Sequence, residues 1–114
     1  MSASGNRGVE SPIQVVPGVA EDRVVVRADL DLALAAVLQA EAEALLVRDG
    51  GRPLVVDLSA TPFLDSSGVQ ALVKVAAAYE GGPGCRVVAA GQPYDVLALT
   101  EVLELLNVER AEGG

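Results

Sequence analysis

The stretch LVVDLSATPFLDSSGVQAL, residues 54–72, runs from apolar, β-branched residues through a short loop into a segment of helix formers. The apolar run over 53–58 predicts a buried strand that the loop SATPFLD follows. A helix is predicted over 66–80, and Asp65 or Ser66 would be its N-cap. Its inner stripe is expected to consist of Val69, Leu72, Val73 and Ala76. A strand that leads into a helix in this way indicates a parallel sheet with crossover helices.

Two further strands and a helix are predicted upstream of this unit. The strands cover 13–19 and 23–28, and a polar turn at Glu21-Asp22 separates them. Pro17 and Gly18 place the first strand at a sheet edge, where a missing N–H is tolerated. The helix covers 30–47 and begins at the N-cap Asp31. Its apolar positions at helical spacing are Leu34, Val37, Leu38, Leu45 and Leu46.

Downstream, a buried strand over 85–90 is followed by a helix from Pro93 that breaks between Thr100 and Leu103. The resulting order is β β α β α β α, with a hairpin first and parallel strands after it. The sequence therefore predicts a small α/β domain, a mixed sheet of about four to five strands covered by helices. We expect 12–108 to form this domain, between a disordered N-terminal tail over 1–11 and a frayed C-terminal tail over 109–114.

The charge balance narrows the possible functions. The chain has 8 basic and 16 acidic residues, a formal net charge of −8, and no basic cluster. Nucleic acid and anionic lipid are therefore poor partners, whereas a basic protein surface would be attracted. Because the chain has no histidine, His-based acid/base catalysis, Ser-His triads and the usual zinc sites are excluded. We expect a protein that is not an enzyme and uses no cofactor or metal.

Cysteine content and hydropathy indicate the cellular compartment of the protein. Cys85 is the single cysteine, so no internal disulfide is possible, and its apolar surroundings predict a small core residue. Apolar runs are far shorter than the ~20 residues needed to cross a bilayer, and the N-terminal MSASGNRGVE lacks the apolar segment of a secretory signal. The expectation is a cytoplasmic protein without direct membrane insertion.

The serine pair in FLDSSGV, residues 63–69, has three possible roles: helix cap, nucleophile or target of a kinase. GxSxG is absent and no general base accompanies the serines, which argues against a hydrolase. Gly68 costs roughly 0.5 to 1 kcal/mol relative to Ala in a helix, so a bare surface there suggests close approach by a partner. Phe63 and Leu64 can hold the loop to the core. A phosphate would add about −1.5 to −2 charges beside Asp65 and would work against binding at a contact face.

Three segments together are similar to a known family: RADLDLA (27–33), LVVDLSATPFLDSSGVQAL (54–72) and VLALTEVLELLNV (96–108). From about residue 13 to 108 the chain resembles the STAS domain of bacterial anti-sigma factor antagonists. The last segment resembles the family's final helix and closing strand. The resemblance implies phosphorylation by an anti-sigma factor serine kinase and dephosphorylation by a serine phosphatase. The unphosphorylated antagonist would bind the anti-sigma factor and free the sigma factor for transcription, a partner switch.

Carried over to this chain, the resemblance implies that Ser66 is the phosphoacceptor and that Asp65 positions it. It also implies that Gly68 keeps the contact surface open and that Ser67 contributes a hydrogen bond. Asp31 would belong to the same binding face, or serve only as a helix cap. The chain departs from the family pattern at Ala28, Leu34 and Glu101.

An alternative interpretation is a STAS accessory or scaffold subunit of a transporter or stress-sensing complex, in which the serine is not modified. The oligomeric state, monomer or weak dimer, is left open by the sequence, as are the identities of the sigma factor and kinase. The free chain and the intact DSSG at 65–68 favour the antagonist.

Overall fold

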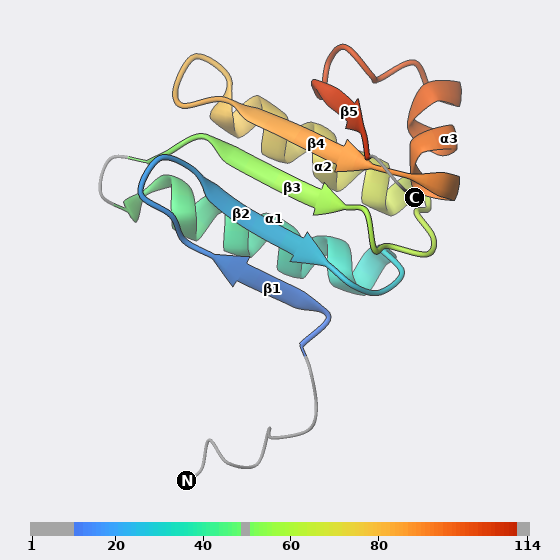
Figure 1. Ribbon diagram of the computed structural model, residues 1–114, viewed down its shortest axis with the longest axis horizontal. Coiled ribbons are helices and arrows are strands. Elements are labelled where there is room, and N and C mark those ends of the chain that lie inside the picture. The colour runs from blue at the N-terminus through green and yellow to red at the C-terminus, as the bar shows by residue number, and fades with distance from the viewer. Residues whose placement is uncertain (1–10, 49–50, 112–114) are drawn as a thin grey trace, which may run out of the picture.

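The computed structural model describes residues 11–48 and 51–111, which form one five-stranded sheet with helices packed on it (Figure 1). The elements in chain order are β1 Ile13–Val16, β2 Asp22–Val26, α1 Leu32–Leu46, β3 Leu54–Leu58, α2 Ser66–Tyr79, β4 Cys85–Ala89, α3 Gly91–Leu99 and β5 Val108–Arg110. The strand order is β1-β2-β3-β4-β5, with β1 antiparallel to β2 and the other neighbours parallel. The predicted α/β class, the hairpin and the edge position of β1 are confirmed.

The ends of the domain differ from the expected boundaries. A fifth strand, β5, closes the sheet beside β4, as the resemblance implied but the predicted element order did not include. The tail expected from residue 109 therefore begins inside β5, and the Ala111 N–H donates to the Ala89 carbonyl at 2.8 Å. The N-terminal tail expected over 1–11 lies outside the described residues except for Ser11.

The loop of the first hairpin is longer than predicted, because β1 ends at Val16 and β2 begins at Asp22. Asp22, predicted to lie in a polar turn, is the first residue of β2 and is only 1% exposed. Its carboxylate accepts a hydrogen bond from the Gly18 N–H at 3.1 Å, which satisfies the buried charge and closes the turn.

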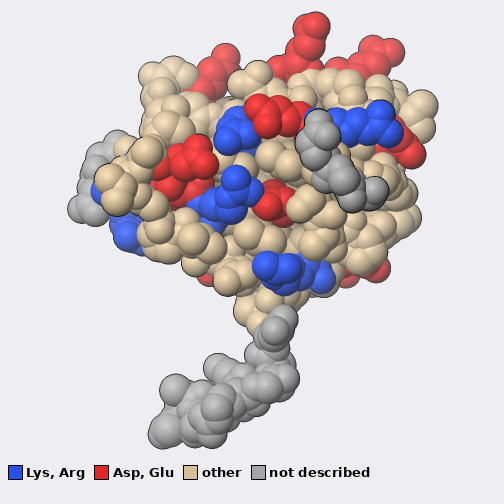
Figure 2. Space-filling model, in the orientation of Figure 1, with Lys and Arg blue, Asp and Glu red and all other residues tan. Residues whose placement is uncertain are grey.

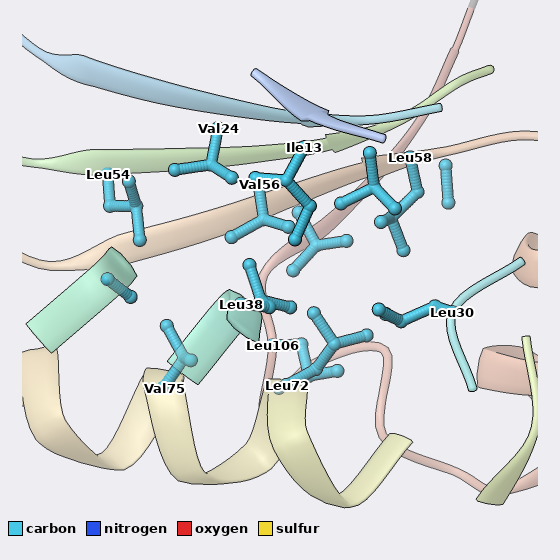
Figure 3. Packing of buried hydrophobic residues seen from close by; sticks show 14 of the residues in the cluster. Ile13, Val24, Leu30, Leu38, Leu54, Val56, Leu58, Leu72, Val75 and Leu106 are labelled. Atoms are coloured by element: carbon cyan, nitrogen blue, oxygen red, sulfur yellow. The ribbon is translucent and has the colours of Figure 1, made fainter. Parts of the chain in front are cut away.

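The core lies between one face of the sheet and the pair α1 and α2, as the side chains in Figure 3 show. Leu38 of α1, Leu72 of α2 and Val56 of β3 meet there, each at most 1% exposed. The remaining buried positions of the two helices are Ala35, Ala42 and Leu45 on α1 and Gly68, Ala71, Val75 and Tyr79 on α2.

The buried faces of both helices agree with the predicted ones only in part. Val37, expected among the inward apolar positions of α1, is 43% exposed, whereas Ala35 is buried. On α2, Leu72 is buried as predicted, but Val69, Val73 and Ala76 are only partly buried. The two helices contact each other, and the small side chains of Ala35 and Ala71 line the groove between them. Cys85 packs against the core as predicted, and burial raises the pKa of its thiol to about 11.

The other face of the sheet carries interspersed basic and acidic side chains (Figure 2). Arg23 Nη1 lies 2.7 Å from Asp57 Oδ2, and Arg86 Nη1 lies 2.8 Å from Glu109 Oε1. Burial alone would raise the pKa of Asp57, but hydrogen bonds from Ser59 and the charge of Arg23 outweigh it and lower that pKa. Within 11–48 and 51–111, no helix combines the length and the apolar content that a membrane span requires.

Candidate functional site

The ends of β2 and β3 lead into two matching turns at one edge of the sheet. Leu30 and Leu64 form a parallel bridge beyond the two strands, and they are 0% and 1% exposed. The Leu30 N–H donates to the Phe63 carbonyl at 2.9 Å, and the Asp65 N–H approaches the Leu30 carbonyl at 3.5 Å. The next residues after the bridged leucines are Asp31 and Asp65, so the structure brings the two predicted aspartates to the same edge.

Each aspartate caps the helix that follows it. Asp31 Oδ1 accepts a hydrogen bond from the Leu34 N–H at 3.0 Å, and Asp65 Oδ1 accepts one from the Gly68 N–H at 3.0 Å. These bonds satisfy N–H groups that have no partner within the helix. Asp31 is thus a helix cap as predicted, and of the two candidates for α2 the cap is Asp65.

Ser66 is consequently the first residue of α2, and its side chain does not cap the helix. It is exposed, and its hydroxyl makes no hydrogen bond to any residue within the described ranges. Ser67 is half-buried and lines a shallow groove of about 110 Å³ between α1 and α2, together with Leu32, Gln70 and Lys74. The two serines therefore differ: Ser66 faces outward from the edge, and Ser67 faces the groove.

Gly68 does not leave an open contact surface, and the expectation that it faces a partner is wrong. The residue is buried, and a Cβ added to it would lie 2.7 Å from the Leu30 carbonyl oxygen and also against the Leu64 side chain. The first turn of α2 packs directly on the bridged leucines, so only glycine fits. The absence of a side chain at Gly68 therefore allows close packing inside the domain, beneath Ser66.

Two polar residues that sequence reasoning missed hold this loop in place. Thr61, only 5% exposed, donates its hydroxyl hydrogen to the Val26 carbonyl at 2.8 Å. Gln92, the second residue of α3, hydrogen-bonds to the backbone of Leu64. Neither residue stands out in the sequence, because each partner lies about thirty residues away along the chain. Leu64 anchors the loop as predicted, whereas Phe63 is 47% exposed and does not.

Exposed apolar side chains complete the surface near Ser66. Leu32, the first residue of α1, is 74% exposed, and Phe63 precedes the bridge on the β3 side. We call the whole surface the Ser66 rim, made of Asp31, Leu32, Phe63, Asp65, Ser66 and Ser67. A surface that combines carboxylates, exposed apolar groups and a fixed hydroxyl is suited to contact another protein.

Comparison with known proteins bears on this surface. A family model described as "Mlab, STAS domain" matches residues 14–110. The chain is similar to the crystal structure of an anti-sigma factor antagonist from Mycobacterium paratuberculosis, at 28% identity over 84% of this chain and 82% of that one, with a TM-score of 0.75. No curated protein sequence matches.

Two more distant structures share the fold alone. The anti-sigma factor antagonist SpoIIAA, in its unphosphorylated form, is 13% identical over 90% of this chain and 89% of that one, with a TM-score of 0.66. The murine anion transporter Slc26a9, in its inward-facing state, is 23% identical over 83% of this chain but only 17% of its own, with a TM-score of 0.62. The same fold therefore occurs in a small antagonist and as a minor part of a transporter.

Proposed function

The chain belongs to the STAS domain family, and on that premise we propose that it is an anti-sigma factor antagonist whose binding is switched off by phosphorylation of Ser66. The unphosphorylated chain binds an anti-sigma factor serine kinase in the cytoplasm through the Ser66 rim, and the sigma factor is released. A serine phosphatase restores the binding form. The likeness to the mycobacterial antagonist supports this assignment over a transporter subunit.

The observation that carries the proposal is the placement of the Ser66 hydroxyl. It is exposed and unbonded among the described residues, yet it stands on a turn fixed by the Leu30–Leu64 bridge and the Asp65 cap. A kinase needs an acceptor oxygen that is accessible and held in one place, because positioning supplies much of the rate of phosphoryl transfer. Ser67 is also held in one place, but it is half-buried and therefore less accessible to a kinase.

A phosphate on Ser66 would disturb binding more than folding. It adds about −1.5 to −2 charges beside the Asp65 carboxylate. A kinase that modifies Ser66 must bind ATP with its phosphates close to the Ser66 hydroxyl. The phosphate on Ser66 would therefore be repelled by the phosphates of the nucleotide that the partner binds. The dianion must also lose water next to the exposed Leu32 and Phe63. A hundredfold loss of affinity corresponds to only about 2.7 kcal/mol. Stability changes little, because a helix N-terminus favours an anion.

The first test is phosphate uptake from ATP in the presence of the anti-sigma factor kinase encoded nearest to this chain's gene, read by intact mass. We expect one phosphate on the wild type, none on Ser66→Ala and one on the matched control Ser67→Ala. Uptake by Ser66→Ala would show that another residue is the acceptor. If the kinase binds but transfers no phosphate, the scaffold alternative gains support.

The second test is the affinity of Ser66→Asp for the same kinase, measured by titration calorimetry. We expect binding at least tenfold weaker than that of the wild type, with an unfolding midpoint in urea that is nearly unchanged. Equal affinities for the two chains would contradict the proposed switch.

A further inference from the structure

The start of α3 is attached to the Ser66 turn by one side chain. The Leu64 N–H donates to Gln92 Oε1 at 2.8 Å, and Gln92 Nε2 donates to the Leu64 carbonyl at 3.2 Å. A carboxamide has the same donor and acceptor pair as a peptide group. Gln92 therefore pairs with Leu64 as a residue of a neighbouring strand would.

The geometry around Leu64 is that of a central strand. On one side Phe63 and Asp65 pair with Leu30, and on the other side Leu64 pairs with the Gln92 side chain. Backbone groups of a strand alternate between its two neighbours in this way. The segment that leads into Ser66 is thus held from both edges, by the β2–α1 turn and by α3.

From this geometry we infer that Gln92 is a positioning residue for Ser66, acting through Leu64. The inference deepens the proposed function, on which its kinetic readout rests. Gln92 is half-buried, and its two side-chain hydrogen bonds are made to Leu64 and not to Ser66. On the Leu30 side, the bond from the Leu30 N–H to the Phe63 carbonyl is short at 2.9 Å, but the Asp65 N–H, next to Ser66, lies at a long 3.5 Å from the Leu30 carbonyl. The two bonds between Gln92 and Leu64, at 2.8 and 3.2 Å, therefore add to the hold on the backbone two residues before the acceptor hydroxyl.

The packing of α3 does not depend on these bonds. Leu97 is 0% exposed and Pro93 is also buried, so the helix stays attached to the domain through apolar contacts. Replacement of the Gln92 carboxamide should therefore release the Ser66 turn and leave α3 in place. Gln92→Met keeps the length and volume of the side chain and removes both hydrogen bonds, which makes it the variant of choice.

The partner-free test is amide hydrogen exchange followed by NMR. In Gln92→Met we expect the Leu64 amide to exchange at least tenfold faster, and the Gly68 amide, which reports the cap after Ser66, to accelerate as well. Tyr79→Phe is the matched control, because it removes a hydrogen bond to the Ala42 carbonyl at the far end of α2. Unchanged exchange at Leu64 in Gln92→Met, or equal acceleration in Tyr79→Phe, would overturn the inference.

The kinetic test is the rate of Ser66 phosphorylation by the same anti-sigma factor kinase, the one encoded nearest to this chain's gene. A misplaced acceptor lowers kcat, so we expect kcat to fall about tenfold in Gln92→Met with little change in KM, and neither to change in Tyr79→Phe. Wild-type kcat in Gln92→Met would overturn the positioning role. If the wild type itself takes up no phosphate, the proposed function fails, and the exchange rates at Leu64 and Gly68 decide by themselves whether Gln92 fixes the turn.

Discussion

Replacing Gly68 with alanine separates two explanations of this glycine. If the bare surface served a partner, Gly68→Ala would fold normally and lose only binding. The structure indicates the opposite, because the new Cβ would lie 2.7 Å from the Leu30 carbonyl oxygen and 3.1 Å from Leu30 Cγ. The carbonyl belongs to the backbone and cannot rotate away, so the first turn of α2 must shift.

The expected size of the effect follows from two opposing terms. Alanine is favoured over glycine within a helix by roughly 0.5 to 1 kcal/mol. Overpacking of a closely packed site costs about 1 to 3 kcal/mol. Because the clash is with backbone, the upper part of that range, about 2 to 3 kcal/mol, applies here. The net result is a loss of roughly 1 to 2.5 kcal/mol in the free energy of unfolding, and hence a Tm lower by about 5 to 10 °C for a domain of this size.

The assay is urea and thermal unfolding of the variant beside the matched control Gly82→Ala. At Gly82 the nearest atom to an added Cβ is the Tyr79 carbonyl oxygen at 3.7 Å, an ordinary contact, so stability should stay the same or rise slightly. A Gly68→Ala chain as stable as the wild type would refute the packing argument and return this position to the binding surface.

Three further changes test other parts of the structure. Glu101 has a φ of 61°, so Glu101→Gly should raise the free energy of unfolding in urea by up to about 1 kcal/mol; a loss would mean that the Glu101 side chain stabilises the fold. Burial raises the pKa of Tyr79 from 10.0 to about 12 and that of the Cys85 thiol to about 11, so stability should fall as pH rises through this range, and Tyr79→Phe should abolish the part of the fall above about pH 11. Asp31→Ala should cost about 1 kcal/mol in urea unfolding while Asp31→Asn stays near wild type, and equal losses would exclude a capping role.

Local patterns in the sequence predicted every helix and strand except β5, but not how these elements face each other. The strand β3, the helix α2 and the caps Asp31 and Asp65 follow from apolar runs and capping residues that act over a few positions. The buried face of α1 does not, because valine outranks alanine on any hydropathy scale. Close contact with α2 nonetheless buries Ala35 and leaves Val37 outside.

The candidate site shows the same limit. Ser66 was selected because the segment around it resembles the family motif, and its phosphorylation stays a prediction for a residue that the structure shows to be exposed. The need for glycine at position 68 comes from its close packing against Leu30, and the anchoring of Leu64 comes from its hydrogen bonds with Gln92. Both pairs are formed only when the crossover connections bring separate strand ends together. A single sequence contains no local signal for such contacts.

The exposure of Leu32 and Phe63 has a consequence for cells that carry several related chains. Neither side chain is buried in the core, so exchanges at these two positions leave the scaffold nearly untouched. Recognition can then diverge between paralogues while the acceptor serine and its cap stay the same. Under the proposed function, these two apolar residues would determine which partner each chain binds and would keep parallel signalling pathways separate.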